Sequence, residues 1–523
     1  MKGKWCTGIF KRAAGSALFF LFSCSHFTKN KSHQQVADAD IARGKTLAEA
    51  HCQSCHLLPD PGLLDAKTWQ TGVLPAMGPR LGVFDFGYNH YPSSRSDQNI
   101  AKDFYPAKPV VNNEEWQQII DYYTSLAPDT MPQQQRKYPV SAGLSLFSVV
   151  KPPDAMHVPA TTFVEIDTLS FPRQVVTADM ITKEIFRYNT SLQLTDSFAN
   201  KVAVVNIDRH PQEIIACNIG VMNPNNGKYG SAIRLRTDKK GKMTADSSMH
   251  FEHLGRPVQV SAADFNNDGI TDYLVCEFGH LEGALSWMEG KAGNTFERHV
   301  LRGMPGAIKA CIRDVNNDGL QDIWVLFTQG EEGIFLFTNK GRGRFEQQEL
   351  IRFPSIYGSS YFELADFNKD GHPDILYTCG DNADYSAVLK PYHGVYIYLN
   401  DGSNHFKEAF FFAMHGCFKA MARDFDGDGD LDIASIAFFA DYLHHPEESF
   451  IYLENRGGLN FQPFSLPGTN TGRWLTMDAG DLDGDGKTDL ILGNFSVAPG
   501  AIKAADDWKK GPAFILLKNT GRK

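Results

Sequence analysis

The hexapeptide HCQSCH at residues 51–56 contains the residues best suited to cofactor chemistry. In a C-x-x-C-H sequence the two thiols stand one helical turn apart, where they can add across both vinyl groups of a haem, and the adjacent imidazole can bind the iron. A structural zinc pair would need further Cys or His nearby, and a redox C-x-x-C does not need the following His. The motif therefore predicts one covalent haem c, attached at Cys52 and Cys55, with His56 as the first axial ligand.

A thioether is the expected sixth ligand, because it fills the last iron position and commits the haem to electron transfer. Met77 is the only Met between the haem motif and the following helical pattern, so it is the preferred ligand. His90 and Met131 remain alternatives, and a packing role is common for a single Met. The second ring nitrogen of His56 is expected to bond a backbone carbonyl such as that of Pro59.

Two helices are expected to position this group. Asp38 and Asp40 can cap a helix that runs toward the cysteines, and apolar residues at helical spacing predict a second helix after Asn113. With the C-x-x-C-H motif, residues 37–136 resemble a class I cytochrome c. In that family a small residue on the first helix lets the last helix cross closely, and Gly44 stands at the corresponding place. The resemblance implies an electron-transfer domain.

The N-terminal residues indicate export. Basic residues precede a short apolar run that ends in Leu-Phe-Ser-Cys24, which resembles a bacterial lipoprotein box. We expect a signal peptide at residues 1–23, a lipid on Cys24 and a tether over residues 24–36, with plain cleavage as the alternative. The expected location is periplasmic or on the cell surface, anchored to a bacterial membrane.

Composition narrows the classes of partner. The 523-residue chain carries a net charge of -10 and no basic run, which argues against nucleic acid as a partner. Five of its cysteines remain after the haem, lipid and signal-peptide positions are assigned, and we expect most of these to be small buried residues. They are Cys217, Cys276, Cys311, Cys379 and Cys417.

A nine-residue pattern recurs at intervals of about 50 to 60 residues, which indicates a repeat architecture. Each copy has Asp at position one, Asn or Asp at three, Asp at five, Gly at six and Asp at nine. The copies span residues 264–272, 314–322, 366–374, 424–432 and 481–489, and a degenerate copy starts at Asn206.

The oxygen-rich loops suit calcium, which prefers hard ligands in a flexible loop. An EF-hand would need flanking helices and Glu at position twelve, whereas here strands flank the loop. The pattern resembles FG-GAP/VCBS repeats, known from integrin α-chain propellers, which implies about five bound Ca²⁺ in a structural role. The expected ligands are Asp264, Asn266, Asp268, Asp272, Asp314, Asn316, Asp318, Asp322, Asp366, Asn368, Asp370, Asp374, Asp424, Asp426, Asp428, Asp432, Asp481, Asp483, Asp485 and Asp489.

Four short strands and an Asn-x-Gly turn in each repeat are typical of a propeller blade. The fold class is therefore mainly β, a seven-bladed calcium-loop β-propeller at residues 160–523, with six or eight blades as alternatives, preceded by the small all-α cytochrome c domain. Residues 137–159 are expected to be an extended linker. A spare strand at residues 161–167 is expected to complete the last blade, and a short first blade to begin near residues 174–179.

Two surfaces of the propeller are candidates for a ligand. Alternate residues of a strand share a face, which predicts a polar, partly basic channel around the axis, able to receive an anion or a sugar. Solvated channel residues with salt partners such as Asp478 are the alternative. The second surface is an irregular loop around residues 380–393. The residues named for these surfaces are Lys309, Arg313, Lys419, Arg423, Tyr361, Asp384 and His393.

The preferred hypothesis is an exported haem electron-transfer protein that works with a redox partner protein, while the propeller docks a partner or substrate. An alternative is a haem-linked dehydrogenase acting on a sugar or alcohol, although no flavin, quinone or dinucleotide motif is present. A third hypothesis is a glycan- or protein-binding adhesion module with a redox-sensing haem. Whether the chain is an enzyme stays open at this point.

Overall fold

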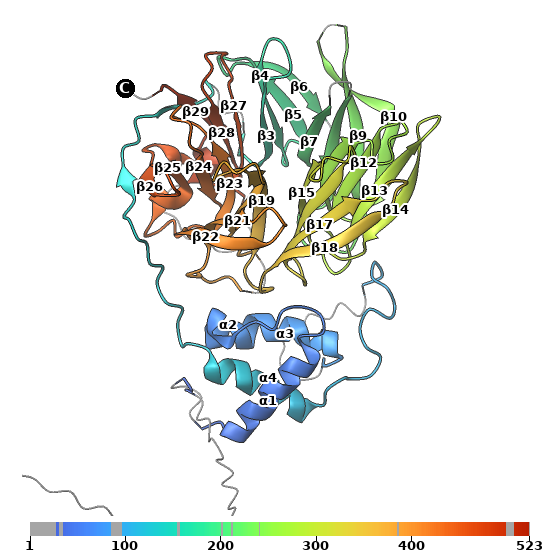
Figure 1. Ribbon diagram of the computed structural model, residues 1–523, viewed down its shortest axis with the longest axis vertical. Coiled ribbons are helices and arrows are strands. Elements are labelled where there is room, and N and C mark those ends of the chain that lie inside the picture. The colour runs from blue at the N-terminus through green and yellow to red at the C-terminus, as the bar shows by residue number, and fades with distance from the viewer. Residues whose placement is uncertain are drawn as a thin grey trace, which may run out of the picture.

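The computed structural model describes residues 28–30, 35–84, 97–153, 157–199, 202–210, 213–239, 241–383, 386–497 and 507–521. These residues form a small helical unit beneath a ring of seven sheets (Figure 1). The predictions for the signal peptide, Cys24, His90 and Asp384 lie outside the described residues. Within them, no helix is long and apolar enough to cross a membrane.

The helical unit is built on two longer helices, α1 (Asp38–His51) and α4 (Asn113–Leu126), close to the predicted ranges. A capping box between Asn112 and Glu115 starts α4. The start of α1 differs from the prediction, because its N-cap is Ala37 and no side chain caps it. The shorter elements between them are η2 (Pro61–Leu63), α2 (Ala66–Thr68), the π-helical turn η3 (Trp69–Val73), α3 (Leu74–Met77) and η4 (Gly78–Leu81).

Gly44 is where α1 and α4 cross, as the sequence predicted. A Cβ atom at this position would lie 1.9 Å from the carbonyl oxygen of Gln118 and 3.0 Å from Cβ of Tyr122. The helices therefore approach as closely as their backbones allow. Trp69 and Trp116 fill the core beside the crossing and are almost completely buried.

We expect Gly44→Ala to destabilise the helical unit, although Ala is the better helix former. Helix propensity alone would favour Ala by about 1 kcal/mol. The added methyl group meets a backbone carbonyl instead, so the helices must separate, and overpacking of this kind costs roughly 1–3 kcal/mol. Thermal unfolding followed by circular dichroism measures the change. Ala50→Gly, at an exposed position of α1, is the control, because it measures the effect of helix propensity without a change in packing. A Gly44→Ala protein at least as stable as the wild type would contradict the close crossing.

Seven antiparallel blades follow along the chain, in agreement with the predicted count. The first four comprise β3 (Thr161–Asp167), β4 (Gln174–Asp179), β5 (Glu184–Tyr188) and β6 (Leu194–Ala199); β7 (Val204–His210), β8 (Glu213–Asn218), β9 (Gly230–Thr237) and β10 (Met243–Leu254); β11 (Pro257–Ala263), β12 (Asp272–Glu277), β13 (Ala284–Lys291) and β14 (Thr295–Arg302); and β15 (Ala307–Arg313), β16 (Asp322–Phe327), β17 (Gly333–Asn339) and β18 (Phe345–Arg352).

The last three blades, like the first four, begin with the strand that lies closest to the axis. They comprise β19 (Ser359–Ala365), β20 (Asp374–Cys379), β21 (Gly394–Asn400) and β22 (Phe406–Ala413); β23 (Cys417–Arg423), β24 (Asp432–Ala437), β25 (Phe450–Asn455) and β26 (Phe461–Ser465); and β27 (Trp474–Gly480), β28 (Asp489–Asn494) and β29 (Phe514–Asn519). Short helices η5 (Pro446–Ser449), η6 (Thr469–Thr471) and η7 (Trp508–Lys510) lie in the loops of blades 6 and 7.

The ring closes differently from the prediction. The fourth strand of blade 7 is β2 (Phe147–Val150), which pairs with β29, and not the segment 161–167. That segment is β3, the inner strand of a complete four-stranded blade 1, so the expected short first blade is also wrong. A further strand, β1 (Ser141–Ala142), runs parallel to β26 on blade 6. Two stretches of the expected linker therefore cover sheet edges, which leaves fewer unpaired backbone groups at the joint.

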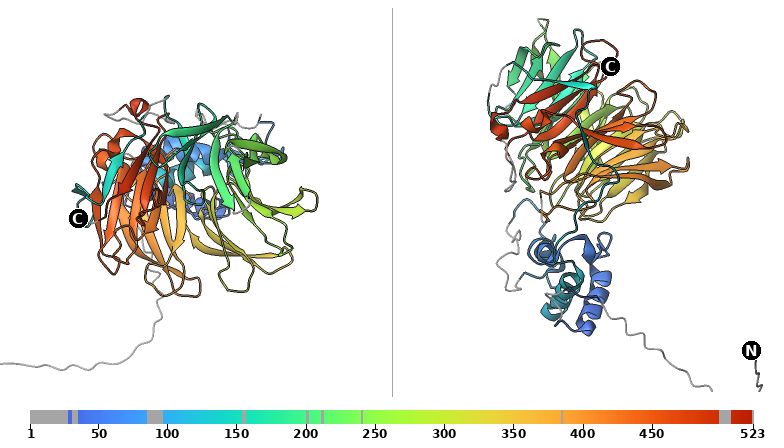
Figure 2. Two further views of the ribbon diagram at one scale, coloured as in Figure 1. Left: turned by 90° about the horizontal axis from the view of Figure 1, so that it is seen from above. Right: turned by 90° about the vertical axis from the view of Figure 1, so that its left-hand side faces the viewer.

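The core lies between the blades. Second strands such as β16 and β20 are buried at all six positions because neighbouring sheets cover both of their faces. One apolar cluster joins Phe265 and Leu274 of blade 3 to Ile323 and Val325 of blade 4, and the other joints have clusters of the same kind. The inner strands face the axis, and β27 packs beside β3 to complete the circle (Figure 2, left).

The propeller has two unlike faces. The Asp-rich loops join first to second strands and lie on one face. The helical unit lies against the other face, which carries the connections from second to third strands and from blade to blade (Figure 2, right). There the Tyr392 hydroxyl donates to the carbonyl oxygen of Leu63 over 3.1 Å, and Ile356 is buried in the helical core. The backbone N–H of Ala101 also donates to Glu282 over 2.9 Å.

Candidate functional site

The C-x-x-C-H motif begins where α1 ends. The backbone N–H of Cys52 still donates to Ala48 over 2.8 Å, which holds the first thiol on the last turn of the helix. Cys52 is half-buried, whereas Cys55 is exposed. Burial, with a smaller contribution from Cys55, raises the pKa of the Cys52 thiol to about 11. The two cysteines and His56 therefore lie together on one short segment beside the helical core.

One ring nitrogen of His56 is hydrogen-bonded to the backbone, which leaves the other nitrogen for a metal. Its Nδ1 lies 2.8 Å from the carbonyl oxygen of Leu57, so the structure uses Leu57 where the sequence suggested Pro59. Donation from Nδ1–H leaves Nε2 as the nitrogen with a lone pair. Burial is the largest effect and lowers the pKa of His56. The positive charge of Arg352 lowers the pKa further, whereas the hydrogen bond to Leu57 and the negative charge of Glu331 raise it. The imidazole is therefore held in the neutral form that binds metals.

Met77 lies at the end of α3, half-buried, and packs against the same helical core as Cys52 and Leu81. Met131 is not among the described residues that pack against that core. Two thiols, an imidazole with one committed nitrogen and a nearby thioether form a donor set that fits haem c. The structure is thus compatible with the predicted ligands, and the ligation itself stays a prediction.

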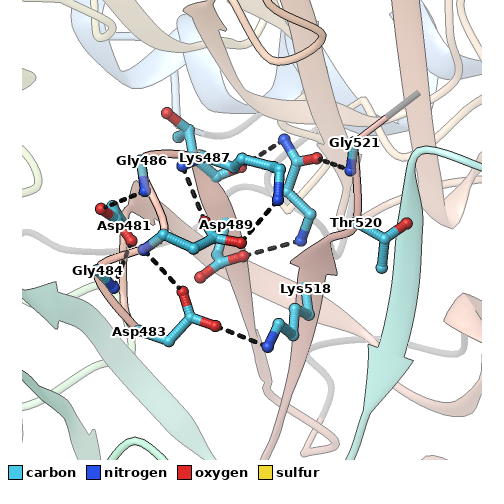
Figure 3. A network of polar contacts seen from close by, with 12 residues as sticks. Asp481, Asp483, Gly484, Gly486, Lys487, Asp489, Lys518, Thr520 and Gly521 are labelled. Carbon is cyan, nitrogen blue, oxygen red and sulfur yellow. Dashed lines mark hydrogen bonds and ion pairs between the residues drawn. The ribbon is translucent and has the colours of Figure 1, made fainter. Parts of the chain in front are cut away.

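The five Asp-rich loops share two backbone hydrogen bonds, seen for residues 481–489 in Figure 3: position one accepts from position six, and position three accepts from position five. A second bond to position one comes from position five in the first three loops and from position four in the last two. The first Asp receives two backbone bonds: Gly484 donates to Asp481 over 2.7 Å and Gly486 over 3.0 Å. Position three receives the amide of position five, since Asp485 N–H donates to Asp483 over 3.2 Å. Gly484 and Gly486 have φ of 82° and 83°, a left-handed conformation that favours glycine. The backbone thus turns the carboxylates toward a common centre.

In the last two loops three carboxylates converge closely. Ligand oxygens of Asp481, Asp483 and Asp489 lie within 4.8 Å of one another, as do those of the corresponding trio in residues 424–432. Burial first, and then the neighbouring carboxylates, raise the pKa of Asp489, and burial raises that of Asp432 to about 7. Carboxylates at such distances repel each other unless a proton or a cation lies between them.

The ninth-position Asp has a second role that the sequence did not reveal. It is fully buried and clamps the blade, because one oxygen accepts the N–H of loop position two and the other accepts an N–H from the end of the third strand. In blade 4, Asp322 accepts from Val315 over 3.1 Å and from Asn339 over 2.7 Å. The clamped residues at the strand ends are Gly290, Asn339, Asn400, Asn455 and Asn519.

The recurring Asn takes part in the turn predicted from the sequence, because its Oδ1 accepts the N–H of the Gly two residues later. In two blades its Nδ2 also links to the preceding blade. Asn339 Nδ2 donates to the carbonyl oxygen of Phe265 in the preceding blade over 2.8 Å, and Asn519 does the same to Phe425 over 2.7 Å. The turn after Asn339 takes its positive φ of 75° at Gly341. In the two blades between, the same Nδ2 nitrogen bonds within its own blade, from Asn400 to the carbonyl oxygen of Pro373 and from Asn455 to that of Leu431.

The predicted channel residues are mostly engaged in joining the blades. Lys309 and Lys419 approach the ring of Tyr361 at 5.9 and 4.8 Å, and Lys419 donates to the carbonyl oxygen of Met477 over 2.7 Å. Arg423 pairs with Glu363 at 3.1 Å, while Arg313 is exposed. The structure thus brings most of these residues together, but largely as partners of one another.

Polar side chains on the inner strands bond to the next strand in the ring. Asp478 accepts from Ile166 N–H over 2.9 Å, and Asp208 accepts from Ala262 N–H over 2.9 Å. The degenerate repeat at Asn206 is therefore part of an inner strand, not a loop. His393 is elsewhere: it is 1 % exposed and lies in the loop before β21, on the face that the helical unit covers.

Lys419 should make stability depend on pH in the alkaline range. Burial lowers its pKa to about 8, with Asp478 opposing the shift. The unfolded chain keeps the proton up to a pH near 10.4, so unfolding takes up a proton between these values and stability should rise from about pH 8 to 10. We expect Lys419→Met to remove this rise, roughly 1–3 kcal/mol in all. Urea unfolding across this range measures it, with Lys340→Met as a surface control; an unchanged pH profile would contradict the buried position.

Comparison with known proteins shows which family of repeats the propeller sequence resembles. A family model described as FG-GAP-like repeat matches residues 314–377 and 424–492. The chain carries FG-GAP-like repeats. The first of these matches begins at Asp314 and the second at Asp424, the first positions of two Asp-rich loops. The predicted FG-GAP repeats and the seven-bladed propeller are confirmed.

The chain is also similar in sequence to integrin alpha-4 of Xenopus laevis, with 27% identity over 145 residues. That match covers 25% of this chain and 14% of the integrin. Solved structures with a similar shape include Sqt1 of Saccharomyces cerevisiae (TM-score 0.43, 9% identity, 71% of this chain and 98% of that one). Another is BBS1N in complex with ARL6DN (TM-score 0.44, 10% identity, 73% and 99%). An FG-GAP propeller is consistent with a binding or docking module.

Proposed function

We propose that this chain is an exported c-type haem electron-transfer protein whose calcium-binding propeller docks a partner or substrate. The observation that carries the proposal is the C-x-x-C-H segment at the end of α1, where Nδ1 of His56 is committed to Leu57 and Nε2 is left for a metal. A haem c bound there supplies a reversible one-electron couple.

The residues of the helical unit have separate tasks in this proposal. Cys52 and Cys55 hold the group covalently, His56 binds the iron through Nε2, and Met77 provides the sixth ligand. The Leu57 carbonyl fixes the orientation of the His56 ring. The signal peptide and the lipid on Cys24 would keep the protein at a membrane surface outside the cytoplasm, where a redox partner protein can reach it.

The Asp-rich loops are proposed to hold about five Ca²⁺ ions. Support comes from their hydrogen-bond pattern, which turns several carboxylates toward one centre, and from the close trio Asp424, Asp426 and Asp432. A divalent cation at that centre would offset the repulsion between the carboxylates. The loops would then be rigid on the face that the helical unit leaves open, which is the docking surface of the proposal.

A redox-titrated visible spectrum of the purified protein tests the proposed function. The chain is produced in a bacterial host that attaches c-type haem in its periplasm. We expect a haem spectrum with one reversible, one-electron transition. Colourless protein, or a haem that does not change between oxidant and reductant, would contradict the proposal.

Met77→Ala should remove the long-wavelength band that methionine ligation gives to oxidised haem. It should also lower the midpoint potential, because a thioether ligand favours the reduced iron. The spectrum of the oxidised protein shows whether the band is present, and the redox titration of the visible spectrum gives the midpoint potential. Met131→Ala serves as the control and is expected to leave the band in place. If Met77→Ala keeps the band, Met77 is not the ligand.

A further inference from the structure

Two arginines and a glutamate of the propeller form a network on the face next to the helical unit. Arg302 ends β14, Arg352 ends β18, and Glu331 lies in the loop between β16 and β17. Glu331 accepts from Arg302 with one oxygen and from Arg352 with the other, the latter over 2.8 Å. Glu349 lies farther off, 3.9 Å from Arg352, and is 43 % exposed, so water screens its charge.

The network keeps donors that nothing in the described part of the chain accepts. Nη1 of Arg302 and Nε of Arg352 are buried without a hydrogen-bond partner there. The side chain of Arg302 is 7 % exposed and stacks on the rings of Phe335, at 3.9 Å, and Phe327, at 4.6 Å. Leaving such donors unpaired costs free energy, which a bound acceptor would recover. Each guanidinium thus keeps one donor for a further acceptor, and a carboxylate is the acceptor that arginine binds most strongly.

The position of the network connects it with the C-x-x-C-H segment. The chain that leaves Arg352 enters the helical unit four residues later, where Ile356 is buried among its core residues. Arg352 and Glu331 both lie within electrostatic range of the His56 ring. The propeller thus places Arg352 toward the side of the helical unit that carries the proposed haem ligands, with Arg302 joined to it through Glu331.

We propose that Arg302 and Arg352, bridged by Glu331, form a carboxylate-binding site that receives the propionate groups of the haem attached at Cys52 and Cys55. This inference rests on the proposed function and adds a role for the propeller in it. Arg352 is a positioning residue that holds the haem edge against blade 4. Its positive charge near the iron favours the reduced, less positive state and so raises the midpoint potential.

The inference is tested on the full-length, haem-loaded protein with Arg352→Gln, Arg352→Lys and Arg302→Gln. At a fixed solution potential we expect Arg352→Gln to raise the ratio of oxidised to reduced haem roughly tenfold, the order of magnitude expected when one unit charge near the iron is lost at an effective dielectric constant near 20. Arg302→Gln should change it in the same direction. Arg352→Lys keeps the charge and should restore most of the wild-type ratio.

Arg187→Gln is the matched control, since Arg187 pairs with Asp196 at 2.5 Å on blade 1, away from the network. It should leave the ratio unchanged, and thermal unfolding shows whether each variant is folded. A ratio unchanged in a folded Arg352→Gln protein, or changed equally in Arg187→Gln, would overturn the propionate site while leaving the proposed function intact. Wild-type protein without covalent haem would overturn the proposed function, and the inference with it.

Discussion

A protein in which Cys52 and Cys55 are both replaced by Ser is expected to contain no covalently attached haem. A hydroxyl group does not form the thioether bond, so the group would be lost on denaturation even if His56 still bound iron. Both cysteines lie just after α1, and Cys52 packs against the helical core, so the proposed attachment would join the haem directly to that core. The expected loss is complete rather than partial.

Haem staining after denaturing electrophoresis measures the attachment. Single variants at Cys52 or Cys55 should retain one thioether and a weaker signal. Cys311→Ser is the matched control, because Cys311 is a free, half-buried cysteine of the propeller. It should keep the full signal. Covalent haem in the double variant would show that the two thiols are not the attachment points.

Asp432→Ala should have the largest effect on the stability of the propeller. The buried carboxylate accepts from the Tyr452 hydroxyl over 2.6 Å, from Asn455 N–H over 2.8 Å and from Phe425 N–H over 3.3 Å. Truncation leaves these donors without an acceptor in a buried place and removes a proposed calcium ligand as well. We expect a loss of about 3–5 kcal/mol in the free energy of unfolding.

Differential scanning calorimetry with and without calcium separates the two contributions. Calcium should raise the melting temperature of the wild type by mass action, and should raise it less in Asp432→Ala. Asp430→Ala is the control from the same loop, because Asp430 pairs with Lys369 at 2.8 Å near the surface and should cost no more than about 1 kcal/mol. Equal melting temperatures for the two variants would contradict the clamp, and a wild type unaffected by chelation would contradict bound calcium.

The sequence predicted the blades well because each repeat carries its own signal. The Asp-rich loop and its flanking apolar strands recur, and a central strand such as β16 is continuously apolar after its first residue. The strand that closes the ring lies outside the repeats, so no recurring sequence pattern marks it. It is Phe147–Val150, a four-residue strand in which only Phe147 is buried, and such a short segment in a proline-containing stretch shows little alternation. The complete strand at residues 161–167 was the more visible candidate.

The residues of the candidate site also fall into two groups, those with a local sequence signal and those brought together only by the fold. The C-x-x-C-H motif depends on local spacing and could be recognised in the sequence, whereas the contact between Tyr392 and Leu63 joins residues 329 positions apart. The network of Arg302, Glu331 and Arg352 likewise combines two blades and a loop. The channel was predicted as a ligand surface because strand alternation shows which residues face the axis but not what they bond. Bonds across the ring, such as Lys419 to Met477, appear only when the blades are assembled.

The most direct test of the proposal is the intact mass of the purified wild-type protein, produced in a host that attaches c-type haem. We predict a mass that exceeds that of the processed polypeptide by one haem, with the addition located on the peptide that contains Cys52 and Cys55. A mass equal to the polypeptide alone, in the same host that loads a control c-type cytochrome, would contradict it.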